Sequence, residues 1–238
     1  MLEQTIFLTV SFFAGILASL AGFGSSMVLL PVALLFFDAK SALFLVACFH
    51  LFGNLFKVRL FLRSIDKRVA FYFGLPSVIF AFVGAMLVSR VPVDSLRTWV
   101  AIFIIVFALY SFIKPYFRLP ETNLTAIIGG SLSGFMAGLI GLGGAIRSTF
   151  LIAFELPKEA YVGTAALIAL VIDLTRVPTY WLTNVVPPGN YYQLLLLLII
   201  TAFVGTRIGK VLLVKLDQST FRKIVLVMLL VVGIKLLF

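Results

Sequence analysis

Two glycine-rich breaks interrupt long apolar segments at matching places in the two halves of this 238-residue chain. The first contains Gly22 and Gly24, and the second contains Gly141, Gly143 and Gly144. Glycine tolerates positive φ and lets a ligand approach the backbone closely. A helix that begins after such a break offers free N–H groups and a partial positive charge to an oxyanion. The alternative is close helix packing through small residues, but two matched breaks favour a binding site.

Four residues beside the breaks could add to an anion site. The hydroxyls of Ser25, Ser26 and Ser148 are hydrogen-bond donors. Arg147 follows the second break, whereas the equivalent place in the first half holds Val28. A cation near the bilayer midplane without a partner would cost several kcal/mol, about 2.5–3.5 on insertion scales. We therefore predict that these four residues and the glycines bind a negatively charged substrate.

A second set of polar residues lies inside apolar segments and repeats with an offset of 119 residues, half the chain. Asp173 and Arg176 are three residues apart, on one face of a helix. The offset carries them onto Asn54 and Lys57, and His50 lies one turn before Asn54. We predict gating or coupling roles for these residues. The alternatives are a static salt bridge for Asp173–Arg176, an interfacial position for Lys57 and a fixed hydrogen bond for His50.

Carboxylates are candidates for ion coupling. Asp173 and Glu155 lie beside or within the apolar segments of the second half. A proton acting through one of them is the simplest coupling ion, and sodium is the alternative. Either carboxylate could instead form a structural pair with Arg147.

The composition is that of a membrane protein. Hydrophobic residues make up 62% of the chain, charged residues 12%, and the mean hydropathy is +1.19. A soluble domain carries about 25% charged residues, so this chain has too little charge for a water-facing surface. The net charge of +10 resides mainly in short loops between apolar runs, which excludes a nucleic-acid binder and points to lipid headgroups and an anionic solute.

The sequence does not predict an enzyme. It contains no HExxH, GxSxG or P-loop pattern. With one cysteine, Cys48, and one histidine, it also lacks the ligands for a Cys- or His-rich metal site. We therefore expect neither a metal nor a cofactor.

Eight apolar segments separate the loops. They are Thr5–Phe37, Ala39–Leu62, Val69–Val88, Arg97–Ile113, Leu124–Leu156, Glu159–Thr183, Tyr191–Leu213 and Phe221–Phe238. The first and fifth contain the glycine breaks and span 33 residues each, well beyond the roughly 20 that one crossing needs. Each is therefore either one long tilted helix or a re-entrant hairpin that leaves on the side where it entered.

Basic residues in the loops favour the hairpin, because cytoplasmic loops are enriched in them. Lys57, Arg147, Arg176 and Arg207 lie inside segments and are not counted. Two hairpins and six crossings place eleven basic residues on one side and four on the other, whereas eight crossings give seven and eight. Three crossings per half also make the second half enter with the opposite orientation.

We therefore predict an all-α polytopic membrane protein made of two repeats. Each repeat has a glycine-broken first segment, re-entrant or V-shaped, followed by three transmembrane helices. Residues 1–115 and 124–238 form the repeats, residues 116–123 connect them, and the repeats are inverted.

Several stretches resemble the TauE/SafE family of sulfite and organosulfonate exporters. They are LAGFGSSMVLLP, GLIGLGGAIRSTFLIAFELPKEAYVGTAA and VGTRIGKVLLVKLDQSTFRKIVLVMLLVVGIKLL. The resemblance covers nearly the whole chain and implies a permease for sulfur-containing anions in the cytoplasmic membrane. Gly-Leu-Gly-Gly-Ala followed by Arg147, and the acidic Asp173, depart from the family pattern and indicate a subfamily with another anion or coupling ion.

The combined expectation is a secondary transporter that moves a small anion, sulfite or an organosulfonate, across the cytoplasmic membrane by alternating access. A membrane assembly or interaction factor that carries no solute is one alternative. A passive anion channel built from the same residues is the other. The sequence does not specify the direction of transport or the oligomeric state.

Overall fold

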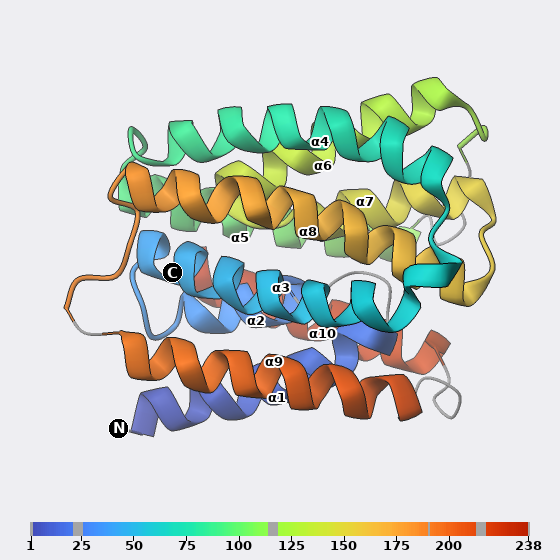
Figure 1. Ribbon diagram of the computed structural model, residues 1–238. Coiled ribbons are helices and arrows are strands. Elements are labelled where there is room, and N and C mark those ends of the chain that lie inside the picture. The colour runs from blue at the N-terminus through green and yellow to red at the C-terminus, as the bar shows by residue number, and fades with distance from the viewer. Residues whose placement is uncertain (1, 21–25, 114–118, 190, 213–217, 238) are drawn as a thin grey trace.

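The computed structural model describes residues 2–20, 26–113, 119–189, 191–212 and 218–237. Within these ranges the chain forms α-helices and short 3-10 turns and contains no strand. The predicted all-α class is therefore confirmed (Figure 1). The predicted site residues Gly22, Gly24 and Ser25 lie outside the described residues.

The two halves follow the same order of helices. The first half contains α1 (Leu2–Leu20), α2 (Ser26–Ala33), α3 (Ala39–Phe61), α4 (Lys67–Val88) and α5 (Val93–Ile113), with a 3-10 turn at Leu62–Ser64. The second contains α6 (Asn123–Ile140), α7 (Gly143–Leu151), α8 (Lys158–Leu182), α9 (Tyr192–Leu212) and α10 (Gln218–Leu237), with a 3-10 turn at Ile152–Phe154. In each half, one short helix follows the break, and three longer helices come after the short one.

Side-chain caps fix where several helices begin. Asp38 accepts a hydrogen bond from the Ser41 N–H (3.0 Å) at the start of α3. Asp66 does the same for the Val69 N–H (2.8 Å) at the start of α4. Each carboxylate satisfies a backbone donor that has no partner within the helix and lies at the positive end of the helix dipole.

The helices suit a lipid environment. By length and composition, six stretches of the described residues could cross a membrane: α3 with its following turn, α4, α5, α6, α8 and α9. Large apolar side chains such as Phe71, Ile79, Val106 and Trp181 are exposed on their outer faces. Such apolar surface is incompatible with water, so the predicted multi-pass membrane protein is confirmed.

Contacts between helix ends show at which end of the bundle each broken segment enters and leaves. Arg68 donates two hydrogen bonds to Asn123 (2.9 and 3.1 Å), and the Asp66 N–H donates to Thr164 (2.9 Å). The starts of α4, α6 and α8 therefore lie at the same end of the bundle, on the right in Figure 1. The pair α6–α7 consequently leaves at the end where it entered.

The first half has the same geometry at the opposite end. The rings of Phe7 in α1 and Phe37 just before α3 are 5.1 Å apart, so the chain returns to its starting end before α3 begins. Lys40 at the start of α3 donates to the Ser89 carbonyl at the end of α4 (3.2 Å). This end is therefore opposite to the one where α4, α6 and α8 begin.

Helices from the two halves pack against each other in matching pairs. α4 packs along α6, and α9, the counterpart of α4, packs along α1. α3 packs along its own counterpart α8 in the middle of the bundle. Phe44 near the start of α3 contacts Trp181 near the end of α8, so these two helices are antiparallel.

Candidate functional site

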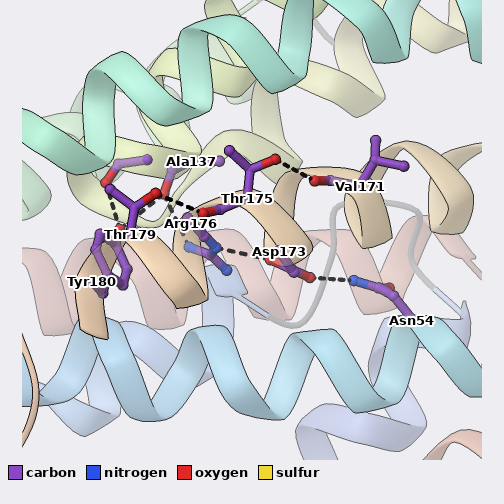
Figure 2. A network of polar contacts seen from close by, with 9 residues as sticks. Asn54, Ala137, Val171, Asp173, Thr175, Arg176, Thr179 and Tyr180 are labelled. Atoms are coloured by element: carbon purple, nitrogen blue, oxygen red, sulfur yellow. Dashed lines mark hydrogen bonds and ion pairs between the residues drawn. The ribbon is translucent and has the colours of Figure 1, made fainter. Parts of the chain in front are cut away.

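A buried polar network joins α3 to α8 (Figure 2). Asp173 lies at its centre and is 2% exposed. One carboxylate oxygen accepts a hydrogen bond from Arg176 Nε (2.8 Å), and the other accepts one from Asn54 Nδ2 (3.0 Å). Because a buried carboxylate is stable only when it is paired and hydrogen-bonded, this network fixes the facing surfaces of the two helices.

Asn54 and Asp173 occupy equivalent positions of the two halves, exactly one 119-residue offset apart. Their contact therefore lies where the matching helices α3 and α8 cross. The sequence analysis singled out both residues by this offset, but it did not predict that they would contact each other.

The network extends from α8 to the end of α6 at the second glycine break. Arg176 Nη1 donates to the Ala137 carbonyl (3.0 Å), and the Tyr180 hydroxyl donates to the Gly138 carbonyl. The Ala137 carbonyl also accepts a hydrogen bond from the Gly141 N–H (3.1 Å). A cation is favourable at this negative end of the helix dipole. Gly141 then ends α6 in the left-handed conformation, with φ of 75°.

Arg147 in α7 is buried and forms no ion pair with another residue that the structure describes. Its side chain is 9% exposed, and Nε has no hydrogen-bond partner. The ion pair Asp173–Arg176 is the only one among the residues that the structure describes. Neither alternative partner, Glu155 or Asp173, therefore forms a salt bridge with Arg147.

Lys57 in α3 belongs to the same electrostatic cluster. It is 7% exposed, and its charge interacts with those of Arg147 and Asp173. His50 lies two turns before Lys57 in α3 and is also buried. The charges of Arg176, Lys57 and Arg147 act on it electrostatically. With Arg176 included, three buried basic side chains and one carboxylate make up this cluster among the described residues, so basic groups outnumber the acidic one.

The small residues of the second break pack tightly. A Cβ on Gly143 would overlap the Ser133 carbonyl oxygen and lie 2.5 Å from the Ala137 Cβ, so glycine lets α7 start directly against α6. The Ser148 hydroxyl donates to the Ala145 carbonyl within α7 (2.8 Å). Gly144 and Ser26 are also buried. The substrate-binding roles of these residues stay predictions.

Glu155 lies apart from the buried cluster. It is exposed at the end of the 3-10 turn that follows α7, with φ of 44°. It is not among the groups whose charges act on Arg147. The coupling role predicted for it stays untested.

Two tyrosines near the cluster did not emerge from the sequence. Tyr180 lies one turn after Arg176 on the same face of α8, and this spacing could have identified it. Tyr161, near the start of α8, interacts electrostatically with Arg147. No spacing predicts that contact, because it depends on how α7 folds back beside α8.

A comparison with protein-family models matches residues 7–236 to the sulfite exporter TauE/SafE family. The chain belongs to the TauE/SafE family. TauE/SafE proteins are exporter-type transporters of sulfite and related anions and are not enzymes, so the predicted resemblance and the non-enzymatic class are confirmed. The cytoplasmic membrane is the usual location of this family. A search of curated proteins finds no match.

Proposed function

We propose that this TauE/SafE protein is a secondary transporter that moves a small anion, sulfite or an organosulfonate, across the cytoplasmic membrane by alternating access. The observation that carries the proposal is the buried guanidinium of Arg147, whose Nε has no hydrogen-bond partner, with Lys57 nearby. Keeping an uncompensated charge away from water costs several kcal/mol. A bound anion supplies the missing counter-charge.

The backbone around Arg147 also favours the binding of an anion. Arg147 lies in the second turn of α7, a helix that begins at Gly143 directly after the break. The N–H groups of its first turn and the guanidinium can therefore act on one oxyanion. A sulfonate or sulfite group has several oxygen acceptors and fits both kinds of donor.

We further propose that the halves, residues 1–115 and 124–238 joined by residues 116–123, are inverted repeats that rock against each other. The antiparallel packing of α3 and α8 supports this arrangement. Inverted repeats expose a central site alternately to the two sides of a membrane. The Asn54–Asp173 contact lies at the crossing of these helices, and there it would act as a gate.

We assign coupling to a proton at Asp173. This carboxylate bonds to both halves of the molecule through Asn54 and Arg176. A proton on Asp173 would weaken both contacts and so favour separation of α3 from α8. Glu155 is exposed and makes no comparable contact with the first half.

Flux measurements in proteoliposomes test the proposal. Labelled sulfite, sulfoacetate, sulfate and chloride are offered to the full-length protein under a pH gradient. Arg147→Met removes the charge while keeping an apolar stem, and we expect sulfite and sulfoacetate flux to fall at least about tenfold, the loss of a charge-assisted bond. The matched control is Arg90→Met, which removes an exposed arginine at the α4–α5 turn. Unchanged flux in the Arg147 variant would remove this residue from the mechanism.

Stability separates a binding role of Arg147 from a structural one. Because the charge has no partner in the empty protein, Arg147→Met should raise the apparent Tm while it abolishes transport. Sulfite should raise the Tm of the unaltered protein and leave that of the variant unchanged. A lower Tm in the variant would indicate that Arg147 stabilises the fold.

The same assay distinguishes the two alternative functions. An anion channel would pass chloride and sulfate continuously, with no dependence on the pH gradient. An assembly factor would show no flux of any of the four anions.

A further inference from the structure

An apolar groove whose lining residues include two arginines lies on the outside of the bundle, between α3 and α9. Phe56, Arg59 and Leu60 of α3 line it on one side, and Phe203, Thr206 and Arg207 of α9 line it on the other. Its volume is about 120 Å³. One water needs about 10–15 Å³ by this measure, so the groove accepts a group of several non-hydrogen atoms.

α3 and α9 pack along each other and run in the same direction (Figure 1). The rings of Phe56 and Phe203 are 4.5 Å apart. A Cβ on Gly53, one turn earlier in α3, would lie 3.8 Å from both Ala202 and Thr206. Arg59 and Arg207 both belong to the lining of this groove, and both side chains are exposed.

Neither arginine forms an ion pair with a carboxylate that the structure describes, because the single ion pair among those residues is the one between Asp173 and Arg176. The groove is also distinct from the buried cluster, because Arg59 lies about 200° around α3 from Lys57. Lys57 is buried, whereas Arg59 faces outward.

The groove lies near the end of the bundle where α3 and α9 end. Arg59 is in the last turn of α3, which ends at Phe61. Arg207 is five residues before the end of α9, about 7.5 Å along the axis. Exposed Arg63 and Lys67 follow at the same end of the bundle, and such a basic end is typical of the cytoplasmic face.

We infer that this groove binds an anionic phospholipid of the cytoplasmic leaflet. Paired guanidinium groups recognise the phosphodiester through charge-assisted hydrogen bonds. The exposed apolar surfaces of Leu60 and Phe203 then lie along the acyl chains. A free phosphate would use the arginines but leave these apolar walls uncovered, so a lipid matches the whole groove better. This inference does not depend on the proposed anion transport.

Native mass spectrometry of the purified full-length protein tests the inference. Phosphatidylglycerol and phosphatidylcholine are titrated separately, and we expect the first phosphatidylglycerol to bind more tightly. Arg59→Gln/Arg207→Gln should reduce that preference about fivefold for each arginine, since a basic residue at the membrane surface contributes about that much. The matched control is Arg90→Gln/Arg97→Gln, which removes two exposed arginines at the opposite end of the bundle and should retain the preference.

Two outcomes would overturn the inference. One is an unchanged preference in Arg59→Gln/Arg207→Gln, or an equal loss in the control. The other is displacement of phosphatidylglycerol by millimolar inorganic phosphate, which would identify a free anion as the ligand.

A local probe keeps the test decisive if the double variant does not fold. Leu60→Trp places a fluorophore in the groove while both arginines remain. Brominated phosphatidylglycerol should quench its emission at lower concentration than brominated phosphatidylcholine does. Equal quenching by the two lipids would contradict a specific site.

Discussion

At the scale of residues, Asp173 determines how the buried charges are arranged. It pairs with Arg176 and accepts a hydrogen bond from Asn54, and both partners are buried. Breaking a buried ion pair on one side costs more than removing both partners, because a lone charge is left away from water. The network is therefore expected to respond non-additively to mutation.

Asp173→Asn should lower the stability of the purified protein by about 3–5 kcal/mol, the usual cost of leaving one member of a buried pair unpartnered. Asp173→Asn/Arg176→Gln should lose less than the sum of the two single variants. Thermal unfolding of all three in detergent measures the coupling, with Asp94→Asn as the control for an exposed carboxylate of α5. Strictly additive losses would mean that Asp173 and Arg176 stabilise the fold independently.

At the scale of elements, glycine lets α4 and α6 approach closely. A Cβ on Gly134 of α6 would lie 2.7 Å from the Cα of Ser77 in α4. The Ser77 hydroxyl crosses the same interface and donates to the Gly130 carbonyl (3.0 Å). Small residues permit such backbone contact where apolar burial does not drive association in lipid.

Gly134→Ala should therefore force the helices apart and destabilise the protein by about 1–3 kcal/mol, as overpacking does. Gly74→Ala is the matched control in α4, since its Cβ would make an ordinary 3.8 Å contact with Val171. It should leave the apparent Tm unchanged or raise it, because alanine favours the helix. Equal melting temperatures for both variants would show that the close α4–α6 contact contributes little.

The elements themselves could be predicted from the sequence, whereas most contacts at the site could not. Apart from a few residues at their ends, the ten α-helices of the described residues lie within the eight predicted apolar segments, and the Gly141 break marked the end of α6. Helical spacing correctly placed Asp173 and Arg176 on one face. It gave no information on which face of α8 meets α3, so the contact between Asn54 and Asp173 emerged only from the packing.

At the scale of the whole molecule, the two central helices run in opposite directions. α3 and α8 occupy the same place in their halves and pack antiparallel. The starts of α6 and α8 lie together at one end, and the turn between α4 and α5 lies at the other. This arrangement supports the proposal of a re-entrant α6–α7 pair and an inverted second repeat.

Single-cysteine labelling from the two sides of the membrane tests that topology. In a Cys48→Ala background, exposed Glu121 and Glu159 flank the pair α6–α7, and exposed Arg90 and Asp94 flank the turn between α4 and α5. We expect cysteines at 121 and 159 to react only with reagent on the cytoplasmic side, where the basic loops lie. Cysteines at 90 and 94 should react only from the outside. If residues 124–156 instead formed one long crossing, positions 121 and 159 would react from opposite sides, and the repeats would then be parallel, with no shared inverted site between them.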